Sequence, residues 1–178
     1  MKLSTADCIT VAMKKLASSR PIDKISVEDI CQAAGCSRPT FYKYYPDKYA
    51  ACYSVYLMSS EKILEDYNGS LDLKTMLTEA LGIIQTDWPF YKNLIKDVYA
   101  QNSFFTQYIE HGMKTNSALI GKAKLTPDLK KILYGYTVGG AHIILQWMQG
   151  GIKEPPENIA DVMCRLVPGE LREYLLRA

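Results

Sequence analysis

The sequence has no hydrophobic run long enough to cross a membrane, and it has almost no strand signals. No stretch reaches about 18 uninterrupted apolar residues, and Asp7 stands where a secretory leader needs an apolar core. Runs of strict apolar and polar alternation are also missing. We therefore expect neither a membrane helix nor a secretory leader, and we do not expect a β-rich fold.

Cysteine and histidine are too few and too scattered to indicate a metal centre or a disulfide framework. The five cysteines are odd in number and lack C-x-x-C spacing, and there are two histidines. No G-x-S-x-G, H-E-x-x-H or P-loop motif is present. We expect no metal, no cofactor, no membrane partner and no enzymatic activity. The simplest expectation is a cytoplasmic protein with reduced thiols.

Positive charge is slightly concentrated in the first quarter of the chain. The whole sequence has 21 basic and 19 acidic side chains, a net charge of +2. Residues 1–48 carry eight basic and five acidic side chains, a balance of +3, which leaves −1 for the remainder. A mildly basic head on a neutral body is consistent with an anionic partner, although it identifies none.

Helical periodicity recurs along the chain and predicts an all-α fold. The first helix is expected to begin at Ser4 or Thr5, and a long one is expected to follow Asp47 and to end near Tyr67. Later helices are expected at 72–86, 88–100, 103–123, 128–149 and 157–177. We expect Pro168-Gly169 to kink or split the last of them.

Two short helices with clear ends lie between these segments. Ser26 is a good N-cap, and Asp29 three residues later makes an acidic variant of the capping box. Gly35 supplies the left-handed residue that ends this helix, and Ser37 caps the next one, which Pro46 stops. Two helices joined by a short turn that contains glycine form a helix-turn-helix.

The second of these helices is suited to reading DNA, because in a helix-turn-helix it lies in the major groove. Arg38 can donate two hydrogen bonds to a guanine edge, and Thr40 can touch a thymine methyl group. We expect Phe41 and Tyr45 to face inward, and we expect Lys48 and the tyrosine hydroxyls to reach phosphates. The alternative is a plain packing unit. The candidate DNA contacts are Ser26, Ser37, Arg38, Pro39, Thr40, Tyr42, Lys43, Tyr44 and Lys48.

The run from Thr40 to Lys48 resembles the signature of the TetR family of transcriptional regulators. Ala34-Gly35-Cys36-Ser37 matches the family's Ala-Gly-Val-Ser turn with Cys in place of Val, and Tyr42 stands at the family's tyrosine. Ala51 departs from the pattern, because a leucine usually follows the lysine there. The resemblance covers about residues 5–52. The later part of the chain resembles the regulators related to dihydroxyacetone kinase control, in Phe104-Phe105, Tyr134-Gly135-Tyr136, Trp147 and Pro155-Pro156.

The resemblance implies a two-part regulator with a helix-turn-helix DNA-binding domain at 1–47 and a ligand-binding and dimerisation domain at 48–178. It implies a ligand-responsive repressor that binds a palindromic operator as a homodimer and responds to a small-molecule effector. The alternative is a protein-interaction module on the same fold that does not bind DNA. Retention of Arg38, Thr40, Lys43 and Lys48 argues against that alternative.

Candidate effector and dimer residues lie in the later helices. Aromatic side chains there indicate either a cavity for an apolar or planar effector, or a core that needs bulk. The candidate effector residues are Tyr56, Trp88, Tyr91, Tyr108, His111 and His142, with His142 expected in the core or in a pocket. In similar proteins the last two long helices form a four-helix bundle with the partner subunit. The candidate dimer residues are Tyr136, Gly139, Gly140, Ile143 and Trp147, and the alternative is tight packing inside one subunit.

Overall fold

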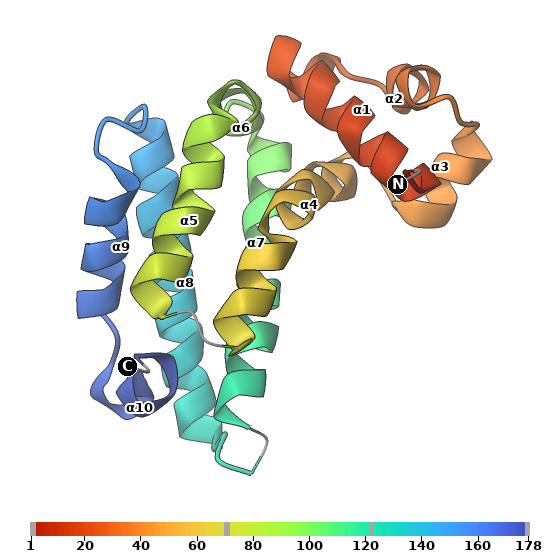
Figure 1. Cartoon of the computed structure of the whole chain (residues 1–178). Helices are drawn as coiled ribbons and strands as arrows, with labels where there is room; N and C mark the ends of the chain where they lie inside the picture. The colour runs from red at the N-terminus through yellow and green to blue at the C-terminus, as the bar shows by residue number, and fades with distance from the viewer. Residues whose placement is uncertain (1–2, 70–71, 122, 177–178) are drawn as a thin grey trace. The chain divides into compact units, whose positions relative to one another are not determined.

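The computed structural model describes residues 3–69, 72–121 and 123–176, and every regular element within these ranges is a helix (Figure 1). The all-α prediction is confirmed. Within the described ranges, no helix combines the length and the apolar character that a membrane crossing requires. In chain order the elements are α1 (Thr5–Ser19), η1 (Ile22–Lys24), α2 (Val27–Ala34), α3 (Arg38–Tyr44), α4 (Lys48–Gly69), α5 (Leu73–Thr86), α6 (Trp88–Leu94), α7 (Val98–Ile120), α8 (Pro127–Gln149), α9 (Pro156–Arg165), η2 (Gly169–Leu171) and α10 (Arg172–Leu175).

The chain separates into two compact units. The first consists of Met1–Ser60 and Thr86–Phe105, and the second consists of Glu61–Gln85 and Thr106–Ala178. This division differs from the expected boundary after residue 47, because the start of α4 and the whole of α6 belong with the first three helices. The assignment of DNA binding to 1–47 and of ligand binding to 48–178 stays a prediction.

The first unit has a core between α1, α2, α3 and α6. Helix α1 contacts both α2 and α6. Ile9, Ile30 and Phe41 are completely shielded from solvent. At the end of α1, the Asn93 side chain donates to the Ala17 carbonyl oxygen at 2.8 Å, which ties α6 to α1. The buried residues of α1, among them Ile9, Met13 and Ala17, thus form part of the core of this unit.

The second unit has its own core, in which α8 contacts α9 and η2. Leu133 and Met148 of α8 are buried, as is Ile159 of α9. Pro168 separates α9 from the short turns that follow, so the predicted interruption of the last helix is confirmed. Helix α7 ends at Ile120, before the predicted end at 123, and Gly121 directly after it has a left-handed φ of 83°. The predicted end at 177 lies outside the described residues.

The expected boundary between the helices at 88–100 and 103–123 is wrong. Helix α6 ends at Leu94 and α7 already begins at Val98. Asp97 makes the break, because its Oδ1 accepts from the N–H groups of Tyr99 at 2.9 Å and Ala100 at 3.2 Å. The sequence interpretation took Ser103 as the cap, although Asp97 is an equally good helix-capping residue.

Candidate nucleic-acid interface

The turn between α2 and α3 is fixed at both of its ends. Gly35 adopts a left-handed conformation with φ of 66°, and the Cys36 N–H donates to the Cys31 carbonyl oxygen at 3.0 Å. Ser37 then begins α3, because its Oγ accepts from the Thr40 N–H at 3.3 Å. The predicted helix-turn-helix is present. Its second helix leaves the turn in one defined direction, since hydrogen bonds close both the end of α2 and the start of α3.

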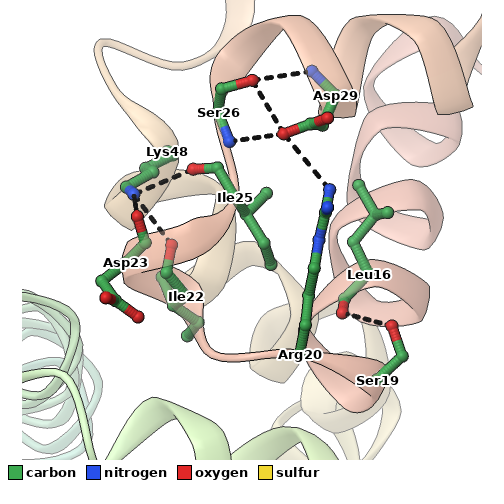
Figure 2. A network of polar contacts seen from close by, with 9 residues as sticks. All are labelled: Leu16, Ser19, Arg20, Ile22, Asp23, Ile25, Ser26, Asp29 and Lys48. Carbon is green, nitrogen blue, oxygen red and sulfur yellow. Dashed lines mark hydrogen bonds and ion pairs between the residues drawn. The ribbon is translucent and has the colours of Figure 1, made fainter.

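Helix α2 is held at its start by the predicted capping box, which Figure 2 shows from close by. The Asp29 N–H donates to Ser26 Oγ at 3.1 Å, and the Ser26 N–H and hydroxyl both donate to Asp29 Oδ2 at 2.8 Å. These bonds from Ser26 hold the pKa of Asp29 below its usual value. The Ser26 hydroxyl, predicted as a DNA contact, is therefore engaged in positioning α2.

One face of α3 anchors it to the rest of the first unit. Phe41 has no exposed surface, and the rings of Phe41 and Tyr45 lie 5.9 Å apart. The Tyr45 hydroxyl lies 2.9 Å from Thr10 Oγ1 of α1. The prediction that Phe41 and Tyr45 face inward is confirmed, and it leaves the opposite face of α3 open to a partner.

That open face carries the remaining candidate contacts of α3. Tyr42 and Tyr44 are 48% and 41% exposed, so both rings are accessible to a partner. Thr40 is half-buried, and its hydroxyl lies 2.8 Å from Ser37 Oγ. The other exposed side chains of this face belong to Ser37, Arg38, Pro39 and Lys43. Helix α3 thus presents two cationic side chains and two tyrosine hydroxyls to solvent, those of Arg38, Lys43, Tyr42 and Tyr44.

Arg38 is paired in the structure, and sequence reasoning missed its partner. Its Nη1 lies 3.6 Å from Glu28 Oε2 of α2, with side chains 57% and 75% exposed. A solvent-exposed pair at this distance contributes at most about 1 kcal/mol, so a nucleic acid can displace it at little cost. The signal available in the sequence was an acidic residue in the first turn of α2, close to the turn that leads into Arg38.

Lys48 makes contacts within the first unit that the sequence interpretation did not identify. Figure 2 shows its ammonium group reaching the backbone of the segment that joins α1 to α2. It donates to the carbonyl oxygens of Ile22 at 2.8 Å and Ile25 at 2.9 Å, and lies 3.5 Å from that of Asp23. An ammonium has three donors, and the carbonyls of this segment engage them. Lys48 is thus a brace between α4 and the η1 turn, and its role as a phosphate contact stays a prediction that competes with this one.

Arg20 is a second brace that the sequence interpretation did not identify. It follows the last turn of α1 and extends to the start of α2, where its Nη2 lies 3.2 Å from Asp29 Oδ2 (Figure 2). Together with Lys48 it holds the connection between α1 and α2 from two sides. Both contacts join residues far apart in the sequence, so no local pattern predicted them.

The candidate effector residues divide between the two units. Tyr56 and Tyr91 are buried in an aromatic cluster of the first unit, where each ring lies less than 6 Å from that of Phe104, at 5.8 and 5.9 Å. Their packing accounts for them as core residues. Trp88 is half-buried at the start of α6. Effector binding by these three stays a prediction.

The other candidate effector residues lie in the second unit. Tyr108 and His111 are half-buried on α7, and burial lowers the pKa of His111. His142 is exposed, with its Nδ1 at 3.2 Å from the Val138 carbonyl oxygen. The expectation of a core or pocket histidine at 142 is therefore wrong, because this turn of α8 presents His142 on its solvent side.

Gly140 and Trp147, both predicted at a dimer interface, pack inside the subunit. A Cβ at Gly140 would lie 2.9 Å from Met163 Cε of α9. The Trp147 indole N–H donates to the Glu154 carbonyl oxygen at 2.9 Å, and its side chain is buried. These contacts support the alternative of tight packing within one subunit for Gly140 and Trp147, and a role of either residue in a dimer stays a prediction.

The remaining predicted dimer residues border open surface. Gly139 is exposed with nothing near the position of a Cβ. Ile143 is half-buried, and so is Tyr136, whose hydroxyl donates to the Met163 carbonyl oxygen at 3.2 Å. Of these three residues, Ile143 borders a groove of about 510 Å³, which is lined by Ile143, Gln146, Trp147, Gly150, Lys153, Glu154, Ile159 and Val162.

The fold and this interface define a class of protein: a helix-turn-helix regulator with a helical body. Comparison with known families identifies the family within this class. Residues 9–50 match the model described as bacterial regulatory proteins of the tetR family, and residues 72–169 match a transcriptional regulator C-terminal region. The chain belongs to the TetR family of transcriptional regulators.

Curated relatives and solved structures agree with this assignment. The HTH-type transcriptional regulator EthR of Mycobacterium tuberculosis is 48% identical over 42 residues, which cover 24% of this chain and 19% of EthR. The match thus spans about a fifth of that relative's length. The dihydroxyacetone kinase operon activator DhaS superposes with a TM-score of 0.64 over 98% of this chain and 99% of its own, at 17% identity. The TetR family repressor AlkX from Dietzia sp. superposes with a TM-score of 0.57 over 99% of this chain and 100% of its own, at 16% identity. These structures share the fold.

Proposed function

We propose that this regulator is a ligand-responsive repressor that binds a palindromic operator as a homodimer, with α3 in the major groove. The observation that carries the proposal is the two-sided character of α3. Phe41 locks one face into the core, while Arg38, Lys43 and the two tyrosines are exposed on the other. A rigidly held helix with an exposed basic and aromatic face is what groove recognition requires.

The chemistry of the exposed side chains divides them into two groups. Arg38 can make the paired contact to a guanine edge, and the Thr40 methyl group can touch thymine, so these two read bases. Lys43 and the tyrosine hydroxyls reach phosphates and position the helix without reading sequence. Lys48 and Arg20 contribute indirectly, because their contacts hold the α1–α2 connection on which this arrangement depends.

The dimer is proposed to form through the open face of α8 and the adjoining groove. Gly135 and Gly139 leave that face without side chains that would block a second helix. Tyr134 of α8 and Leu166, just after α9, are each 55% exposed and supply apolar area. Two heads held by such a dimer match half-sites about one helical turn apart, which is the basis of operator palindromy.

The effector is proposed to be a small apolar or planar compound that changes the separation of the two heads. Tyr108 and His111 of α7, both in the second unit, are the candidates for contacting it, since their side chains are half-buried and retain accessible surface. The related structure of RolR is described as a complex with the ligand resorcinol, a small aromatic compound. Since the regulator acts on DNA, it is expected in the cytoplasm, where a bacterial chromosome lies.

Selection of binding sites from random DNA tests the proposal. The purified protein is expected to enrich a palindrome whose half-sites are about 10 base pairs apart or a multiple of that, with two chains per duplex. Addition of small aromatic compounds is then expected to raise the melting temperature and release the DNA. Equal retention of all random sequences would contradict operator binding and would favour the protein-interaction alternative.

A further inference from the structure

Two of the five cysteines flank the turn of the helix-turn-helix. Cys31 lies in the last turn of α2 and is buried, whereas Cys36 is half-buried and directly precedes Ser37, the cap of α3. Both are free thiols in the structure. No role proposed so far uses either of them. Their location matters because any change between them acts at the start of the DNA-reading helix.

The backbone brings these two residues within disulfide reach. The Cys36 N–H donates to the Cys31 carbonyl oxygen at 3.0 Å, and the Gly35 N–H to that of Gln32 at 3.4 Å. These two hydrogen bonds form the pattern of a Schellman motif at a helix end. In that motif the side chains at the positions of Cys31 and Cys36 touch. The first bond limits the Cα separation to about 7 Å at most, and disulfides span Cα distances of about 4.4–6.8 Å.

The side chains interact as the backbone geometry indicates. Burial raises the pKa of the Cys31 thiol, and the Cys36 thiol beside it raises it further. Of the two thiols, Cys36 is the more accessible, because it is half-buried whereas Cys31 is buried. An accessible thiol next to a second thiol is the arrangement found at redox-sensing cysteines.

We propose that Cys31 and Cys36 form a redox modification site, in which a hydroperoxide closes a disulfide across the turn and weakens operator binding. The Cys36 thiolate attacks a peroxide oxygen, the O–O bond breaks, and an alcohol, or water from hydrogen peroxide, leaves with the proton. The Cys31 sulfur then attacks the resulting sulfenic acid, and its S–O bond breaks to release water. Two thiols are oxidised and one hydroperoxide is reduced.

The disulfide shortens the distance between the two sulfurs and so moves the turn. Sulfurs in non-bonded contact lie roughly 4 Å apart, whereas bonded sulfurs lie about 2.05 Å apart. Cys31 is embedded in α2, so the shift falls mainly on Cys36 and the start of α3. Arg38 stands two residues further on. Its displacement by even 1 Å breaks the paired contact to a base, a consequence that rests on the proposed function. Cytosolic thiols restore the reduced state.

Thiol mapping and DNA binding on the full chain test the site separately. The reduced protein is treated with equimolar hydrogen peroxide and then measured by intact mass and by alkylation of remaining thiols. We expect a mass loss of about 2 Da, from two hydrogens, with Cys31 and Cys36 protected from alkylation. We also expect about tenfold weaker binding to the selected operator, the equivalent of one paired base contact. Dithiothreitol should reverse both changes, which separates them from methionine oxidation.

Two variants complete the test. Cys36→Ala is expected to keep its operator affinity after peroxide, whereas Cys8→Ala, which removes a half-buried cysteine from α1, should respond as the parent does. Full alkylation of both residues after peroxide would overturn the proposal. So would a mapped disulfide that leaves operator affinity unchanged. If the reduced protein selects no DNA, the proposed function fails, and thiol mapping still decides whether the pair closes.

Discussion

Replacement of Lys48 by methionine tests the reassignment of this residue from a phosphate contact to a brace. The variant keeps an unbranched side chain that is one heavy atom shorter, and it removes the charge. It leaves the carbonyl oxygens of Ile22 and Ile25 without the donors that stand at 2.8 and 2.9 Å. Because those hydrogen bonds are only partly buried, water can donate to the two oxygens and restore part of the lost stabilisation.

The size of the effect follows from these two hydrogen bonds. A hydrogen bond from a charged donor contributes about 1.5–3 kcal/mol. Partial solvent access at Lys48 reduces this to about 1 kcal/mol for each bond, so we expect a loss of roughly 2 kcal/mol in the free energy of unfolding. In a chain of 178 residues this corresponds to a fall of about 4–8 °C in the melting temperature.

Thermal unfolding and the salt dependence of DNA binding are measured together on the same variants. Lys24→Met is the matched control, because Lys24 lies in η1, its side chain is 74% exposed, and it pairs with the neighbouring Asp23. Its melting temperature should stay close to the parent value. Lys43→Ala should lower the salt slope by about 0.9 per subunit, while Lys48→Met should not change it. An unchanged melting temperature with a lowered salt slope for Lys48→Met would refute the brace and restore the phosphate contact.

Two further predictions concern the dimer and the acid sensitivity of the first unit. Gly139→Glu places a charge on the open face of α8, where no neighbouring atom of the same subunit obstructs the new side chain. Sedimentation of this variant should show monomers. A dimer that persists would show that the interface lies elsewhere. Asp29 has a lowered pKa because Ser26 hydrogen-bonds to its charged form. Its contribution is therefore complete above the unfolded pKa of about 4 and is lost as pH falls through the lower folded value. Asp29→Asn should flatten the acid limb of melting temperature against pH, and an unchanged limb would contradict the role.

Features that depend on neighbouring residues could be predicted from the sequence. The capping box at Ser26, the left-handed Gly35 and the cap at Ser37 are set by backbone chemistry within a few residues. The inward position of Phe41 and Tyr45 follows from helical spacing. These local rules suffice to outline the helix-turn-helix, because its turn is short and its ends are marked by residues with few alternatives.

Features that depend on distant contacts could not be predicted in this way. Lys48 contacts carbonyls more than 20 residues earlier in the chain, at Ile22 and Ile25. Gly140 faces Met163 of α9, and no pattern within α8 distinguishes a neighbour in the same subunit from one in a partner. The apolar surroundings of His142 in the sequence indicated burial, whereas the turn of α8 exposes it.

The most direct test of the central claim is the base preference of an Arg38 variant. Site selection is repeated with Arg38→Ala and with Lys15→Ala, a control that removes an exposed cation from α1. If α3 reads bases, Arg38→Ala loses discrimination at one base pair of each half-site, by about 1–3 kcal/mol, while Lys15→Ala selects the parental operator. Selection of the same sequence with the same stringency by Arg38→Ala would show that Arg38 does not read bases and would contradict the account.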